Sequence, residues 1–307
     1  MLAAVIGYAD AQDYPAKNMR IVATAPGGFA DVSARIIAQG LTVNHGRTVI
    51  VENRGGATFA IEMVAKASPD GYTLLLYGSS IWLLPFMRDN LPYDPLRDLT
   101  PITLTTRSPN VVLVPPTVQA NSVADLIALA KARPGALNYG SGLSGSTPHL
   151  AAELFKAMAG VDIVRVPYKG AAPALNGLLG GEVQVMFAAV PAALPHVKAG
   201  RVRALAVTSM QPSSLFPGLP SVAASGVPGY ESVAIFGVFA PGKTPVTVVR
   251  RLNQEIVPVL VAQEVKQKFM ASGAEVIAST PAELLATVKS EMARMGKVIK
   301  AAGIRDE

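Results

Sequence analysis

Short apolar segments with the character of β-strands alternate with amphipathic helical segments along most of this 307-residue chain. Strands that alternate with helices at this spacing form parallel sheets covered by helices, so the sequence predicts an α/β fold. The predicted strands are residues 20–24, 48–52, 73–77, 111–114, 163–166, 183–187, 203–208 and 233–239. The predicted helices are residues 32–41, 60–67, 123–130, 150–158, 171–179, 191–199, 246–260, 264–272 and 281–301.

Several loops of small residues directly follow the predicted strands, and they begin at Pro26, Gly78, Gly140, Pro167 and Ala188. In open α/β sheets, ligands bind at the carboxyl ends of the strands. We therefore expect these loops to converge on one cleft.

Residues 140–149 read GSGLSGSTPH and lie between a short apolar segment and a helical pattern. We predict Thr147 as the N-cap of that helix and Pro148 as its first residue. The free N–H groups and the dipole at a helix N-terminus favour an anion. We interpret this loop as a grip for the carboxylate of a small ligand. An ordinary strand-to-helix turn is the alternative interpretation.

Residues 26–31 read PGGFAD and repeat the same arrangement of strand, glycine-rich loop and helix. Asp31 is predicted as an N-cap that holds its own helix. A polar contact from Asp31 to a hydroxyl or amine of a ligand is the alternative.

Composition excludes several classes of protein. Half of the residues are apolar and 16% are charged, which indicates a globular chain. The net charge of +6 is scattered, without basic runs interleaved with aromatic residues, so no nucleic-acid partner is expected. The chain has no cysteine, which excludes disulfides and thiolate chemistry.

The first residues resemble the end of a secretory signal. Residues 2–7 are apolar, and Ala9-Asp10-Ala11 fits the small-x-small pattern of signal peptidase cleavage. We interpret residues 1–11 as a residual signal segment, so that an exported mature protein begins near Gln12. A stray N-terminal helix is the alternative. No later stretch is long and apolar enough to span a bilayer.

Motifs for catalysis are weak. Residues 237–244 match the phosphate-loop pattern, but Pro241 lacks an N–H group, and Val238 and Phe239 fit a strand interior. The histidines at 45, 149 and 196 are far apart and have no second metal ligand nearby. Ser144 lacks the complete G-x-S-x-G surround of a nucleophile elbow. We therefore predict no catalytic residue, metal or cofactor. The alternative, which we do not favour, is a hydrolase that uses His149 as a general base.

Several segments together resemble the Bug-type periplasmic solute-binding proteins of tripartite tricarboxylate transport systems, over essentially the whole chain from Tyr14 onward. These segments are residues 26–31, 51–54, 69–75, 91–95, 166–170, 191–196 and 203–208, which read PGGFAD, VENR, PDGYTLL, LPYDP, VPYKG, PAALPH and RALAVT. The resemblance implies a Venus flytrap fold with two lobes and two crossovers, near residues 110–116 and 228–236. Lobe 1 would comprise residues 12–112 and 233–307, and lobe 2 residues 113–232.

The resemblance also implies a carboxylate held between two loops, through backbone N–H groups and ordered waters. The loops that match are residues 26–31 and 141–149, with residues from two further loops at the sides. The expected ligand-binding residues are Pro26, Gly27, Gly28, Phe29, Ala30, Asp31, Ser79, Ser80, Ser141, Gly142, Ser144, Gly145, Ser146, Thr147, His149, Lys169, Gly170 and Ala188.

The function implied is that of a monomeric periplasmic receptor that delivers an organic carboxylate to membrane permease subunits. Many relatives have an aspartate where this chain has Ala188, so we expect a larger and less acidic pocket. That favours a plain dicarboxylate, or an aromatic or longer carboxylate, over a ligand with an amino group. A receptor that addresses a signalling partner is the alternative, which the sequence does not separate from transport.

Overall fold

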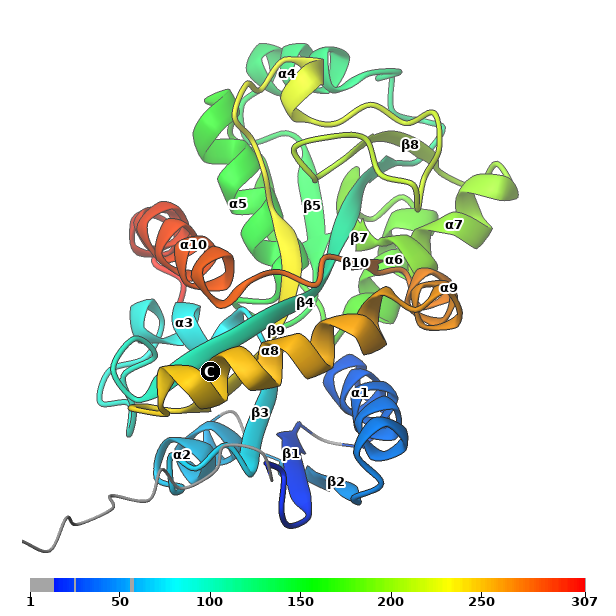
Figure 1. Cartoon of the computed structure of the whole chain (residues 1–307). Coiled ribbons are helices and arrows are strands. Elements are labelled where there is room, and N and C mark those ends of the chain that lie inside the picture. Colours follow the sequence, from blue (N-terminus) through cyan, green and yellow to red (C-terminus); the bar gives the residue numbers. More distant parts are fainter. Residues whose placement is uncertain (1–13, 25, 56–57, 307) are drawn as a thin grey trace, which may run out of the picture.

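The computed structural model describes residues 14–24, 26–55 and 58–306 (Figure 1). The strands are β1 (Met19–Ala23), β2 (Val49–Asn53), β3 (Thr73–Gly78), β4 (Leu99–Val114), β5 (Asn138–Ser141), β6 (Val164–Pro167), β7 (Val185–Ala189), β8 (Arg203–Val207), β9 (Val233–Pro241) and β10 (Glu275–Val276). The α-helices are α1 (Phe29–His45), α2 (Phe59–Ala65), α3 (Ser80–Leu83), α4 (Val123–Ala132), α5 (Thr147–Ala159), α6 (Ala171–Leu179), α7 (Val190–Lys198), α8 (Val246–Val261), α9 (Gln263–Ala271) and α10 (Pro281–Ala301). The predicted signal segment, residues 1–11, lies outside the described residues.

The strands pair in the order β2-β1-β3-β9-β4-β7-β5-β6, and β8 and β10 pair with β4. β1 is parallel to β2 and β3, and β5 is parallel to β6 and β7. Parallel neighbours need crossover connections, which α1 supplies between β1 and β2 and α5 supplies between β5 and β6. Figure 1 shows two halves, with β1, β2 and β3 in the lower one and β5, β7 and β8 in the upper one. The α/β class predicted from the sequence is confirmed.

β4 is a 16-residue strand that runs through both halves (Figure 1). Its residues up to Pro109 pair with β9, and those from Asn110 onward pair with β7 and β8. The sequence predicted only residues 111–114 of this strand. The first part of β4 was not predicted because it contains Pro101, and proline cannot donate a hydrogen bond to a neighbouring strand. The register between β4 and β9 shifts beside Pro101. The lobe boundaries, 12–112 with 233–307 and 113–232, stay a prediction.

β9 also explains the apparent phosphate-loop motif at residues 237–244. Gly237 and Val238 lie inside β9 and pair with Tyr77 and Leu76 of β3. A strand interior cannot wrap a phosphate, so the rejection of this motif is confirmed.

Helix α10 contacts elements of both halves, including α3, α5 and β4. On its inner face the Trp82 Nε1–H donates to Glu291 Oε2 over 2.9 Å. Trp82 is fully buried and Glu291 is 5% exposed. The bond thus fixes α3, which follows the Ser79-Ser80 loop, against the C-terminal helix.

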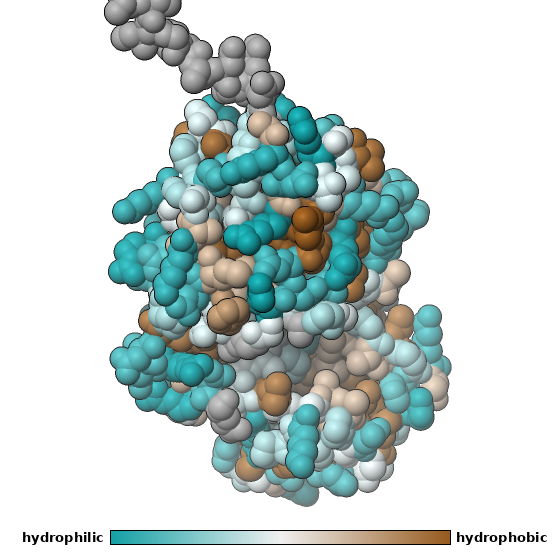
Figure 2. Space-filling model, turned by 90° about the horizontal axis from the view of Figure 1, so that it is seen from below, coloured by the Kyte–Doolittle hydropathy of each residue, from teal (hydrophilic) through white to brown (hydrophobic). Residues whose placement is uncertain are grey.

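The face in Figure 2 is mainly hydrophilic, with its apolar residues in small separate patches. Within the part of the chain that the structure describes, no helix combines the length and apolar character that crossing a membrane requires.

Glu291→Gln should stabilise the protein at pH 8 and have little effect at pH 5. Burial raises the pKa of Glu291 to about 7 from an ordinary 4.5, and the hydrogen bond from Trp82 only partly opposes it. Its contribution to stability is therefore complete below about pH 4.5 and is lost as the pH rises through about 7. A shift of this size corresponds to roughly 3 kcal/mol.

Urea unfolding at the two pH values measures this effect. Glutamine keeps the acceptor for Trp82, and Glu264→Gln on an exposed carboxylate is the matched control. A stability difference between Glu291→Gln and the wild type that does not change with pH would show that the buried carboxyl does not titrate in this range.

Candidate functional site

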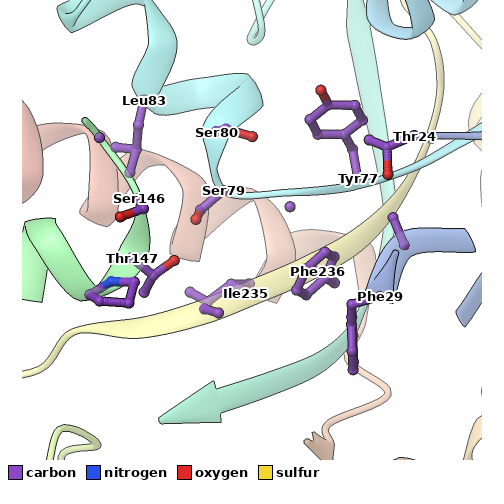
Figure 3. Close-up of a pocket in the computed structure, with 15 residues that line it drawn as sticks. Thr24, Phe29, Tyr77, Ser79, Ser80, Leu83, Ser146, Thr147, Ile235 and Phe236 are labelled. Carbon is purple, nitrogen blue, oxygen red and sulfur yellow. The ribbon is translucent and has the colours of Figure 1, made fainter. Parts of the chain in front are cut away.

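A cavity of about 460 Å³ lies where loops of the two halves meet β9 (Figure 3). Its lining comprises Thr24, Phe29, Ala30, Tyr77, Gly78, Ser79, Ser80, Leu83, Gly145, Ser146, Thr147, Pro148, Ala234, Ile235 and Phe236. The N-terminal ends of α1, α3 and α5 all contribute to this lining. The first N–H groups of a helix have no partner within the helix, so this cavity collects backbone donors.

The loop before α1 is braced from inside by Asp31. The Asp31 carboxylate accepts from the Gly27 N–H and from Asn53 Nδ2, each over 2.9 Å. Arg35 Nε lies 2.9 Å from the same carboxylate. Burial raises the pKa of Asp31, but these partners outweigh burial and the pKa lies below its usual value. Asp31 is therefore an ionised, buried side chain (4% exposed) that supports the loop from beneath and does not line the cavity.

The N-cap of α1 is Gly28 and not Asp31, which is the third residue of the helix. The prediction of Asp31 as N-cap was wrong, because its side chain reaches back to Gly27, one residue before the cap. Asn53 also donates to the Thr24 carbonyl over 2.7 Å, which ties the ends of β1 and β2 together.

The loop before α5 is braced in the same way by His149. Ser146 is the N-cap and Thr147 the first helical residue, so the predicted cap was wrong by one position. His149 Nδ1 accepts from the Gly145 N–H over 3.1 Å. Burial lowers the pKa of His149 to about 4, and the charge of Arg165 adds to this effect. His149 is thus neutral at pH 7, and its Nδ1 is free to accept.

The two braces are equivalent in position. Each joins a glycine with positive φ, 78° at Gly27 and 71° at Gly145, to the residue four places later in the sequence. That residue is the third of its helix in both cases. Because only glycine readily adopts a positive φ, the donor residue of each brace, Gly27 or Gly145, has to be glycine.

Arg165 of β6 holds the outer side of the α5 loop. Its guanidinium donates to Ser141 Oγ over 2.8 Å, to the Gly142 carbonyl over 3.0 Å and to Ser144 Oγ over 3.1 Å. Gly142 also packs against the next loop, since a Cβ on it would lie 3.0 Å from the carbonyl carbon of Gly170. Arg165 was not among the predicted site residues, although a charged residue within an apolar strand candidate was the available signal.

Seven of the predicted ligand-binding residues line the cavity. They are Phe29, Ala30, Ser79, Ser80, Gly145, Ser146 and Thr147. The Ser146 hydroxyl is buried and has no hydrogen-bond partner among the described residues. Figure 3 shows Ser146 and Thr147 at the start of α5, Ser79 just before α3, and Ile235 and Phe236 along β9.

A second group of predicted residues supports these loops without lining the cavity. It comprises Gly27, Asp31, Ser141, Gly142, Ser144, His149 and Gly170. Pro26, Gly28 and Lys169 are exposed and lie outside the lining. Ala188, expected at the far wall of the pocket, is buried inside β7 opposite Val111.

The lining residues that the predicted set lacked come mainly from β9 and from strand ends. They are Thr24, Tyr77, Gly78, Leu83, Pro148, Ala234, Ile235 and Phe236. Gly78 and Pro148 belong to loops that the sequence had already marked. Ile235 and Phe236 looked like ordinary strand interior, so their place at the cavity depends on the tertiary fold.

Known proteins with similar sequences and structures cover nearly the whole chain. A family model described as "Tripartite tricarboxylate transporter family receptor" matches residues 33–304. Protein BugT of Bordetella pertussis is 37% identical over 96% of this chain and 92% of its own length. The structure titled "R. palustris Rpa4515 with adipate" is 38% identical, covers 96% of this chain and 100% of its own, and has a TM-score of 0.76.

A further solved structure is MatC from Rhodopseudomonas palustris with bound malate. It is 28% identical, covers 93% of this chain and 99% of its own, and has a TM-score of 0.72. Similarity of this extent to solved structures, together with the sheet arrangement, confirms the predicted two-lobed α/β fold.

Arg165→Met should raise the pKa of His149 from about 4 toward its ordinary 6.5, because a positive charge beside the imidazole is removed. Amide exchange at Gly145 should become faster, because the loop loses the three hydrogen bonds from Arg165. An NMR titration of the His149 ring measures the first effect, and hydrogen exchange measures the second.

Arg203→Met is the matched control, since Arg203 is also a strand residue but donates to carbonyls near Val118. If the pKa of His149 is the same in the wild type and Arg165→Met, burial alone keeps the imidazole neutral.

Proposed function

Because the chain belongs to the tripartite tricarboxylate transporter receptor family, we propose that it is a periplasmic receptor for a small organic carboxylate. The ligand binds between the two lobes and is delivered to membrane permease subunits. The observation that carries this proposal is the pair of equivalent glycine braces that aim the N-termini of α1 and α5 at one cavity.

The electrostatics of the cavity suit a carboxylate. Each helix N-terminus carries about half a positive charge, and the N–H groups there point outward as donors. The hydroxyls of Ser79, Ser146 and Thr147 add neutral donors beside these groups. The carboxylate is therefore held by dipoles and needs no arginine or lysine in contact with it.

Two similar proteins support the ligand class, since their structures contain adipate and malate. Both ligands are organic carboxylates, and the protein bound to adipate shares 38% of its residues with this chain. The cavity takes elements from both halves of the molecule, which suits a ligand that is enclosed when the lobes close.

The site supports binding more than catalysis. His149 is the histidine nearest in sequence to the cavity loop, but its Nδ1 is used by Gly145. With a pKa of about 4, the imidazole is also a weak base. No group of three or more metal-binding side chains occurs within the residues that the structure describes.

Thr147→Pro should weaken carboxylate binding by about 1–3 kcal/mol, because it removes one backbone N–H at the start of α5. Proline is well tolerated at the first position of a helix, and the extended ψ of 154° at Ser146 suits a residue before proline. Titration calorimetry with adipate, the ligand of a similar protein, measures the change.

Thr147→Val is the matched control, because it removes the hydroxyl and keeps the N–H group. Equal affinity of folded Thr147→Pro and wild type would exclude this helix end as the anion site. A thermal-shift panel of mono-, di- and tricarboxylates tests the wider proposal, and a folded protein that responds to none of them would contradict it.

A further inference from the structure

The cavity combines backbone donors with an apolar wall. Phe29, Leu83, Ile235 and Phe236 are its large apolar side chains. The rings of Phe29 and Phe236 lie 4.5 Å apart between centroids, at an interplanar angle of 44°. Phe29 comes from α1 and Phe236 from β9, so this wall begins beside the first glycine-rich loop (Figure 3).

No described residue in the lining has a cationic or carboxylate side chain. The internal positions outside the described residues, 25, 56 and 57, are Ala, Gly and Ala in the sequence and carry no charge either. The cavity can therefore solvate one carboxylate through its helix ends, but it offers no counter-ion to a second one.

The cations on the surrounding loops are engaged or lie elsewhere. Arg165 makes three hydrogen bonds to the outer side of the α5 loop. Arg35 pairs with Asp31 beneath the α1 loop. Lys169 is exposed and is not part of the lining. None of them is placed to receive a charged group within the cavity.

We propose that the ligand has a hydrocarbon segment, either a methylene chain or an aromatic ring, directly beyond the carboxylate that the helix ends hold. This inference rests on the proposed function and narrows its ligand class. Short di- and tricarboxylates such as malate and citrate bind weakly, because their further carboxylates would lose water beside Phe29 and Phe236 without gaining a counter-ion.

A second carboxylate is tolerated where the hydrocarbon segment is long enough to carry it out to solvent. Adipate has four methylene groups between its carboxylates and meets this condition. Malate has its second carboxylate only two carbons from the first, too near for that charge to reach solvent past the apolar wall.

Titration calorimetry on the dialysed full chain tests the proposal with five ligands. Hexanoate, adipate and benzoate should each bind at least about tenfold more tightly than malate and citrate, because burial of their hydrocarbon adds to the affinity. Malate or citrate binding as tightly as adipate would overturn this inference and leave the carboxylate receptor intact. Binding of none of the five would instead overturn the proposed function.

Phe236→Ala supplies a test within the protein. It should lower the affinity for adipate and hexanoate at least about fivefold, because a hydrocarbon contact is lost. The affinity for malate and citrate should not change. Phe236→Leu keeps an apolar side chain and should retain most of the selectivity. An equal loss for all five ligands would show that Phe236 shapes the fold and does not select the ligand.

If Phe236→Ala fails to fold, Phe29→Ala and Phe29→Leu provide the same comparison. Phe29 is half-buried at the start of α1 and forms the other side of the aromatic pair.

Discussion

The structure of the site depends on one type of local hydrogen bond, which joins residues four places apart and occurs twice. In each case a glycine N–H donates to a side chain at the third position of the following helix. The bond closes the loop onto its helix, which leaves the first helical N–H groups directed outward. The hydrogen bonds that Asp31 accepts lower its pKa and keep it ionised, whereas His149 can accept because burial keeps it neutral. Different side chains thus meet the same geometric requirement.

The long strand β4 places the two braced loops opposite each other. Its change of partners between Pro109 and Asn110 joins the two halves of the sheet. The local alternation of strands and helices was predictable because it depends on the side chains of each segment alone. The full length of β4 was not, since Pro101 breaks the local pattern and only pairing with β9 makes the segment a strand.

Much of the site was predictable for a related reason. Glycine-rich loops after strands reveal backbone donors directly, so the loops of Gly27 and Gly145 could be found from the sequence. Phe236 could not, because its place depends on β9 becoming the neighbour of β3. Arg165 left a signal as a charged residue within an apolar strand, but its partners depend on β5 becoming the neighbour of β6. Ala188 was expected in the loop after its strand, but β7 extends through it. Its contact with the ligand stays a prediction.

Holding an anion with dipoles has a consequence for the whole binding reaction. An arginine would neutralise the ligand, but N–H groups and hydroxyls solvate its charge without removing it. The closed cavity then contains a net negative charge, and each further charge costs more in a region of low dielectric constant. Such a site gains its remaining affinity from uncharged surface. In the proposed site, the apolar wall of Phe29 and Phe236 supplies that uncharged surface.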